Sequence, residues 1–182
     1  MRKKTNYYIS YLFALLGVII AIFFDQFTKM LAVKHLKKQN SIDLIENVFQ
    51  LHYLENRGAA FGMLQNQKIF FVIIGIVILV AVTVFYVKLP HNRYFLPLRI
   101  CLLFIASGAI GNMIDRIRLD YVIDFLYFKL IDFPVFNVAD IYVTVSAFAL
   151  VFLILFHYKD EDLESVFHLF SRKKKEEQEH IS

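Results

Sequence analysis

The chain has 182 residues, of which 58% are hydrophobic, and its formal net charge at pH 7 is +4. Soluble domains are usually about 45–50% apolar, so the composition excludes an ordinary soluble domain and favours an integral membrane protein. The small basic excess is a signal of membrane topology, and we expect no nucleic-acid partner. Because Cys101 is the only cysteine, an intramolecular disulfide and a cysteine-based zinc site are excluded.

Four long apolar stretches each approach the ~20 residues that a helix needs to cross the hydrocarbon core of a bilayer. They lie at residues 8–24, 69–87, 95–114 and 141–158. The sequence therefore predicts an all-α membrane protein with four transmembrane helices. We expect one domain over residues 1–158 and a charged cytoplasmic tail over residues 159–182. The first stretch follows a basic cluster but lacks a small-x-small cleavage site, so we interpret it as a retained span.

The basic residues near the ends of these stretches favour an orientation with both termini in the cytoplasm. Arg2, Lys3 and Lys4 precede the first stretch, and the connection at residues 88–93 is basic and contains no acid. The segments after the first and third stretches are then extracytoplasmic.

The extracytoplasmic segment at residues 25–68 is too long for a simple turn. Residues 29–38 have the pattern of a basic amphipathic helix lying on the lipid headgroups. Residues 47–54 partly alternate between polar and apolar, which predicts a strand and hence a small β-like platform. Residues 56–62 follow, and their two glycines permit a simple turn or a close approach to a ligand. We expect the segment to form a platform and a lid.

Two aspartates lie where a carboxylate is costly. Asp124 has apolar neighbours on both sides, and Asp140 leads directly into the uncharged stretch at residues 141–158. A carboxylate at the bilayer centre costs about 2.5–3.5 kcal/mol on insertion scales, so it usually faces a partner, a cavity or a reaction. Two carboxyl groups that share a proton can activate water with one member and protonate a leaving amine with the other.

Asp140 also has a structural interpretation. Asn137 is placed to cap the fourth helix, and Asp140 would then lie near the positive end of the helix dipole. Asp115 competes for a place in the pair, but the adjacent Arg116 favours a structural ion pair for it.

Asp25 and Lys29 are spaced i, i+4 where the first helix is expected to end. Such pairs are common and are worth about 0.2–0.5 kcal/mol. The six histidines show no metal-ligand spacing, so we expect no metal and no other cofactor.

Five short motifs occur in the order found in the lipoprotein signal peptidase (signal peptidase II) family. They are Asp25-x-x-Thr-Lys29, Asn56-x-Gly-Ala-Ala-Phe-Gly62, Gly111-Asn-x-x-Asp-Arg116, Val122-x-Asp-Phe125 and Phe136-Asn-x-Ala-Asp140. The chain thus resembles this family over about residues 8–158, although residues 127–135 form a slightly short connection for it. The resemblance implies a bacterial aspartyl endopeptidase of the cytoplasmic membrane. Such an enzyme cleaves diacylglyceryl-modified prolipoproteins just before their lipidated cysteine.

The resemblance also implies roles for individual residues. Asp124 and Asp140 would be catalytic. The residues that bind substrate or support the site would be Asp25, Lys29, Asn56, Gly58, Asn112, Asp115, Arg116 and Asn137. It further implies an active site toward the extracytoplasmic face, contact with membrane lipid and inhibition by globomycin, and we expect a monomer.

A small transporter or proton-conducting subunit is the main alternative, because intramembrane aspartates also form proton relays. That alternative predicts carboxylates near the bilayer midplane, whereas Asp124 and Asp140 lie toward the outer ends of the predicted spans.

Overall fold

The computed structural model describes residues 2–58, 63–162 and 164. Four long helices dominate it, and each contains a segment that is long and apolar enough to cross a membrane. They are α1 (Arg2–Leu36), α2 (Lys68–Lys88), α3 (Leu96–Leu119) and α4 (Val138–Phe152), which a π-helical segment (Leu153–His157) continues. The prediction of an all-α membrane protein with four transmembrane helices is confirmed.

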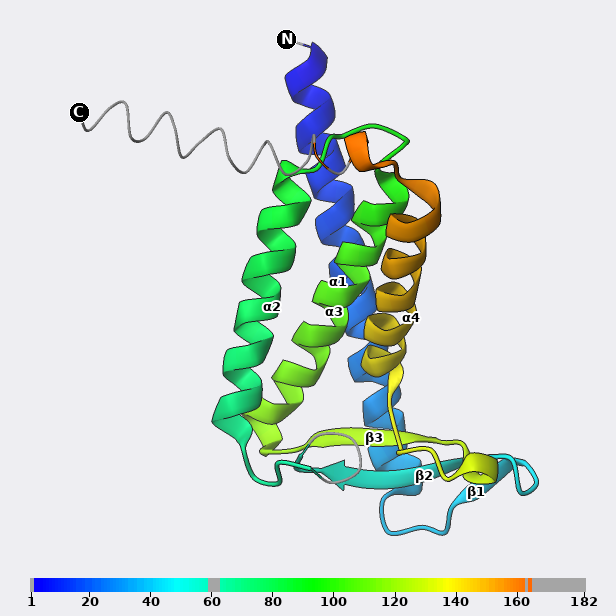
Figure 1. Ribbon diagram of the computed structural model, residues 1–182. Helices are drawn as coiled ribbons and strands as arrows, with labels where there is room; N and C mark the ends of the chain where they lie inside the picture. Colours follow the sequence, from blue (N-terminus) through cyan, green and yellow to red (C-terminus); the bar gives the residue numbers. More distant parts are fainter. Residues whose placement is uncertain (1, 59–62, 163, 165–182) are drawn as a thin grey trace.

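Helix α3 lies at the centre of the bundle and packs against each of the other three helices (Figure 1). It buries polar side chains as well as apolar ones, among them Arg99, Ser107 and Asp115. Gly108 lets α4 approach closely, because a side chain there would collide with the carbonyl oxygen of Ala139. The polar groups of α3 therefore face protein rather than lipid, as membrane burial requires.

A three-stranded antiparallel sheet lies across one end of the bundle (Figure 1). Its strands are β1 (Ile42–Ile45), β2 (Phe49–Asn56) and β3 (Val122–Tyr127), in the order β1-β2-β3. Strand β2 covers most of the strand predicted at residues 47–54, and the sheet is the predicted small platform. Ala32 and Leu36 of α1 pack against Ile123 and Phe125 of β3, which attaches the sheet to the bundle.

Two helices extend beyond their predicted ends. The apolar pattern predicts ends near residues 24 and 114, but α1 continues to Leu36 and α3 to Leu119. The residues that interrupt the apolar pattern, Asp25 and Asp115, are buried and paired inside the protein. The prediction of a separate amphipathic surface helix at residues 29–38 is therefore wrong, because this segment forms the last turns of α1 and the turn that follows them.

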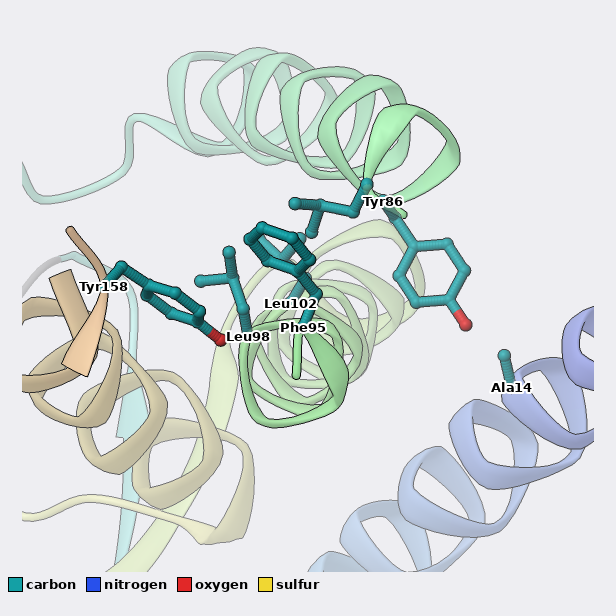
Figure 2. Packing of buried hydrophobic residues seen from close by; sticks show 7 residues of the cluster. Ala14, Tyr86, Phe95, Leu98, Leu102 and Tyr158 are labelled. Carbon is teal, nitrogen blue, oxygen red and sulfur yellow. The ribbon is translucent and has the colours of Figure 1, made fainter. Parts of the chain in front are cut away.

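At the other end of the bundle, a hydrophobic cluster joins the helices. It consists of Ala14, Tyr86, Leu89, Phe95, Leu98, Leu102 and Tyr158. Figure 2 shows the Tyr86 side chain of α2 with its hydroxyl group directed toward α1. Most of the predicted tail at residues 159–182 lies outside the described residues, as do residues 59–62 of the predicted lid.

Candidate active site

Asp124 and Asp140 line the same cavity, which has a volume of about 510 Å³ and lies at the sheet end of the bundle. Asp124 belongs to β3 and is only 1% exposed, while Asp140 belongs to the first turn of α4. The connection between them folds back onto β3. The N–H groups of Phe125 and Leu126 donate to the carbonyl oxygen of Phe136 at 3.0 and 2.8 Å. This return of the chain places the start of α4 beside Asp124.

Asn137 links the two aspartates. Its Oδ1 accepts a hydrogen bond from the Asp140 N–H at 3.0 Å, and its own N–H donates to Asp140 Oδ2 at 3.1 Å, a reciprocal capping box. Because Oδ1 faces the helix, Nδ2 faces the opposite way and donates to Asp124 Oδ1 at 2.7 Å. The cap therefore determines which end of the Asn137 amide meets Asp124. Asn137 can thus cap α4 and bind Asp124 at the same time.

Asn56, in β2, binds the second oxygen of Asp124. Its Nδ2 donates to Asp124 Oδ2 at 2.9 Å, and its Oδ1 accepts from the Gly58 N–H at 3.0 Å. Leu54 pairs with Asp124 across the two strands, so Asn56, two residues further along, lies on the same face of the sheet. Gly58 has no room for a side chain, because a Cβ there would collide with the carbonyl group of Met63.

Asn112, in α3, binds Asp140. Its Nδ2 donates to Asp140 Oδ1 at 2.7 Å. Its Oδ1 accepts hydrogen bonds from Lys29 Nζ and from Asn137 Nδ2, both at 3.0 Å. Since the lysine can only donate, it forces Asn112 to present its amide nitrogen to Asp140. Each carboxylate oxygen of Asp124 and Asp140 thus accepts one hydrogen bond from a fixed donor.

A buried group of charges supports these amides. Lys29 Nζ lies 3.0 Å from Asp25 Oδ2 and 2.9 Å from Asp115 Oδ2, and the lysine is 1% exposed. The free oxygen of Asp25 accepts the Ala139 N–H at 2.9 Å, and Asp115 Oδ2 accepts the Ile123 N–H at 3.2 Å. The two carboxylates therefore hold the start of α4 and strand β3 in place.

This group corrects two predictions. Asp115 forms the predicted structural ion pair, but its partner is Lys29 of α1 rather than the neighbouring Arg116. Asp25 and Lys29 are not an ordinary pair at a helix end, since both are buried and α1 continues beyond them to Leu36. Removing one partner of such a pair is expected to cost about 3–5 kcal/mol, far more than an exposed i, i+4 pair.

Gln26 belongs to the same network, although the sequence did not single it out. Its Nε2 lies within hydrogen-bond distance of Asp25 Oδ2 (3.1 Å), Asp115 Oδ1 (3.0 Å) and the Gly111 carbonyl oxygen (3.2 Å). The available signal was its position: a second polar side chain directly beside Asp25 in an otherwise apolar segment. Gly111 also has a packing role, because a Cβ there would collide with the Asp25 carboxylate.

Arg116 supplies a positive charge in the cavity wall. Its Nη2 donates to the carbonyl oxygen of Gly58 at 3.3 Å, and its guanidinium lies over the Phe71 ring at 4.6 Å from the centroid. It lines the cavity together with Asp124 and Asp140. A guanidinium held in this way can orient the carbonyl groups of a bound peptide or balance negative charge nearby.

The environment of Asp124 changes its acidity. Burial, followed by the nearby charge of Asp140, raises the pKa of Asp124 to about 7, against the opposing effect of the Asn56 and Asn137 amides. Two carboxyl groups that interact in this way titrate as a pair. Near neutral pH such a pair retains a proton that it can give to a substrate, while the second carboxylate remains available as a base.

A second cavity adjoins the first and widens the space around the pair. It has a volume of about 240 Å³ and lies between α2, α3 and α4. The two cavities share Phe71, Arg116, Asp140 and Thr144. Within the described residues, no group of three or more histidine, cysteine, aspartate or glutamate side chains is placed to hold a metal ion.

Comparisons with known proteins show which proteins this chain is similar to. The model of the signal peptidase (SPase) II family matches residues 17–156. A lipoprotein signal peptidase of Caldanaerobacter subterraneus is 47% identical over 144 residues, which are 79% of this chain and 96% of that protein. A lipoprotein signal peptidase of Streptococcus thermophilus is 42% identical over 146 residues, 80% of this chain and 92% of that protein. A solved structure of a bacterial membrane enzyme is 31% identical, with a TM-score of 0.72 over 81% of this chain and 92% of that chain.

Proposed function

The chain belongs to the signal peptidase II family, and we propose that Asp124 and Asp140 are the residues with which it cleaves its substrate. It is an aspartic endopeptidase that removes the signal peptide from diacylglyceryl-modified prolipoproteins, just before their lipidated cysteine. One observation carries the proposal for the two aspartates: both line one cavity and are bridged by a single residue, Asn137.

The reaction follows from the different environments of the two carboxyl groups. The two buried carboxyl groups share a proton, and because the N-terminal end of α4 favours negative charge on Asp140, we assign this proton to Asp124. Asp140 takes a proton from a water molecule while the water oxygen attacks the carbonyl carbon of the scissile peptide bond. Asp124 gives its proton to the leaving amine, so no covalent intermediate is needed.

The supporting residues keep these groups in the reactive geometry. Asn56, Asn112 and Asn137 direct donors at the carboxylates, while Asp25, Lys29 and Asp115 hold the elements that carry them. We assign Gly58 and Arg116 to substrate binding, because both line the cavity and Arg116 offers donors to a peptide carbonyl.

The cavities suit a substrate that is both peptide and lipid. Apolar side chains line the first cavity together with the two aspartates, among them Phe71, Phe133, Ile141 and Val145. The second cavity continues between the membrane-spanning helices. A lipid-modified cysteine and its flanking peptide require such an arrangement, since polar backbone is tolerated at membrane depth only inside protein. We assign the site of globomycin inhibition to the same cavity.

The protein is a multi-pass membrane protein. We place it in the bacterial cytoplasmic membrane as a monomer in contact with lipid, with both termini in the cytoplasm. The basic, acid-free connection between α2 and α3 supports this orientation. The sheet and the active site then face the extracytoplasmic side. The alternative of a transporter or proton-conducting subunit is not favoured, because both aspartates lie at the sheet end of the bundle.

A cleavage assay on a diacylglyceryl-modified precursor tests the catalytic assignment. Asp124→Asn and Asp140→Asn keep size and polarity but remove acid–base function, and each should lower the rate by at least about 10²–10⁴-fold. Asp43→Asn, on the exposed strand β1, is the matched control and should cleave normally. If Asp124→Asn or Asp140→Asn is folded and retains more than about a tenth of the wild-type cleavage rate, the substituted aspartate is not catalytic.

A further inference from the structure

A second group of polar side chains lies at the end of the bundle opposite the sheet, and in it Arg99 and Tyr86 are buried while Ser10 and His91 are half-buried. It consists of Ser10 of α1, Tyr86 of α2, His91 of the α2–α3 connection and Arg99 of α3, and we call it the Arg99 cluster. Arg99 is only 5% exposed. Its Nη2 donates to the Tyr86 hydroxyl oxygen at 2.7 Å and to Ser10 Oγ at 3.2 Å, and its guanidinium lies 4.6 Å from the centroid of the Tyr86 ring.

The cluster contains unused hydrogen-bonding groups. Arg99 Nε and His91 Nε2 are buried and have no hydrogen-bond partner among the residues that the structure describes. The hydroxyl oxygens of Tyr86 and Ser10 accept from Arg99, and each hydroxyl group has one hydrogen that it can donate to a further acceptor. A buried donor without an acceptor is unfavourable, so the arrangement calls for an acceptor that binds several donors at once.

The cluster also lacks a counter-charge. Among the ion pairs of the described residues, none joins Arg99 to a carboxylate. A buried charge without a counter-ion is strongly unfavourable, and the face of the Tyr86 ring offsets only part of that cost. Arg99 lies in the first turns of α3, whose dipole adds positive potential at the same place.

We propose that the Arg99 cluster binds a phosphate group. A phosphate has the several acceptor oxygens that Arg99, Tyr86 and Ser10 would satisfy, and guanidinium groups bind phosphate through paired donors. His91 Nε2 supplies a further contact. The cluster lies where the membrane-spanning helices end, which is the depth of lipid headgroups. The phosphate therefore belongs either to a phospholipid or to the solution, and the chemistry of recognition is the same.

The single cysteine makes the proposal testable. Cys101 is buried in α3, two residues beyond Arg99, and the chain has no other thiol. A thiol-reactive fluorescent dye therefore reports thermal unfolding of the full chain in detergent. Addition of dioleoylphosphatidylglycerol should raise the unfolding midpoint by roughly 2–4 °C. Dioleoylglycerol, which has the same acyl chains without phosphate, should leave it unchanged.

Inorganic phosphate at matched ionic strength distinguishes the two sources. If it raises the midpoint as much as the phospholipid does, the ligand is a free anion; if only the phospholipid acts, the ligand is a headgroup. Arg99→Gln should abolish the shift, whereas Arg93→Gln, which removes an exposed cation at the same end, should keep it.

Tyr86→Phe provides a milder test if Arg99→Gln fails to fold. It keeps the ring beneath Arg99 and removes one hydroxyl donor, so the phospholipid concentration for half of the shift should rise by about tenfold. Three outcomes would overturn the proposal. Dioleoylglycerol could raise the midpoint as much as the phospholipid does, or neither phosphate source could raise it. The midpoint could also rise equally in the Arg93 variant and in whichever variant of the Arg99 cluster folds. The readout does not depend on peptidase activity.

Discussion

Lys29 Nζ lies 3.0 Å from Asn112 Oδ1, and this contact determines which end of the Asn112 amide faces Asp140. A lysine can only donate hydrogen bonds, so Asn112 must turn its oxygen toward Lys29 and its nitrogen toward the carboxylate. A buried charge on α1 thus orients a donor on α3 that binds an acid on α4. The same lysine holds Asp25 and Asp115, so we expect both stability and activity to depend on this one side chain.

Lys29→Met should impair both properties. It leaves Asp25 and Asp115 buried without their cation, which is expected to lower the free energy of unfolding by about 3–5 kcal/mol. It also frees Asn112 to rotate, so cleavage should slow even at a temperature where the variant is folded. The Cys101 dye assay measures the first effect and cleavage of a lipidated precursor the second.

Lys34→Met is the control for this prediction, because Lys34 is an exposed lysine on the same helix. It should change neither property. The double variant Lys29→Met/Asp115→Asn should recover part of the stability but not the cleavage rate. Full recovery of cleavage in the double variant would show that Lys29 does not orient Asn112.

Asn137 offers a way to separate the helix cap from the site. Asn137→Ser keeps a good capping oxygen for α4 but loses the Nδ2 donor to Asp124. We expect its free energy of unfolding to fall by about 1–3 kcal/mol, because buried Asp124 Oδ1 loses its donor while the cap is kept, and its cleavage rate to fall by about tenfold or more. Asn137→Ala should lose both the cap and the donor. If Asn137→Ser cleaves like wild type, the amide serves only as a cap.

The sequence was informative where each residue acts locally and less so where charges pair across the bundle. The four apolar stretches and the spacing of Asn137 and Asp140 predicted the spans and the cap, because both patterns lie within single helices. The ends of α1 and α3 were misplaced because Asp25 and Asp115 interrupt the apolar pattern although they are buried. For Asp115 the partner, Lys29, comes from a distant part of the chain, so single-sequence spacing favoured the adjacent Arg116 instead.

Gly111→Ala tests the packing that brings this network together. A Cβ at this position would collide with the Asp25 carboxylate, and overpacking of a rigid interior usually costs about 1–3 kcal/mol. Gly17→Ala, in α1, is the control, because a Cβ there has no neighbouring heavy atom within 4 Å. The dye assay should show a lower midpoint for Gly111→Ala and an equal or higher one for Gly17→Ala. Equal midpoints for both variants would mean that α1 and α3 can separate at no cost.

The raised pKa of Asp124 predicts how activity and stability depend on pH. Burial and the charge of Asp140 raise this pKa to about 7, whereas an aspartate in an unfolded chain has a pKa of about 3.9. Above pH 7 the pair loses the proton that the leaving amine requires, so the cleavage rate should fall by about tenfold per pH unit.

The raised pKa of Asp124 also affects stability. A salt bridge usually lowers the pKa of an aspartate, so the pH dependence here has the opposite sign. Because the folded protein holds the proton more tightly than the unfolded chain, this group stabilises the fold below the unfolded pKa. That contribution is lost as the pH rises through about 7. The unfolding midpoint should therefore decline from about pH 4 to about pH 7 in wild type and level off above it, and Asp124→Asn should flatten this decline. If the slope is the same in wild type and in Asp124→Asn, the proton that leaves near neutral pH does not belong to the aspartate pair.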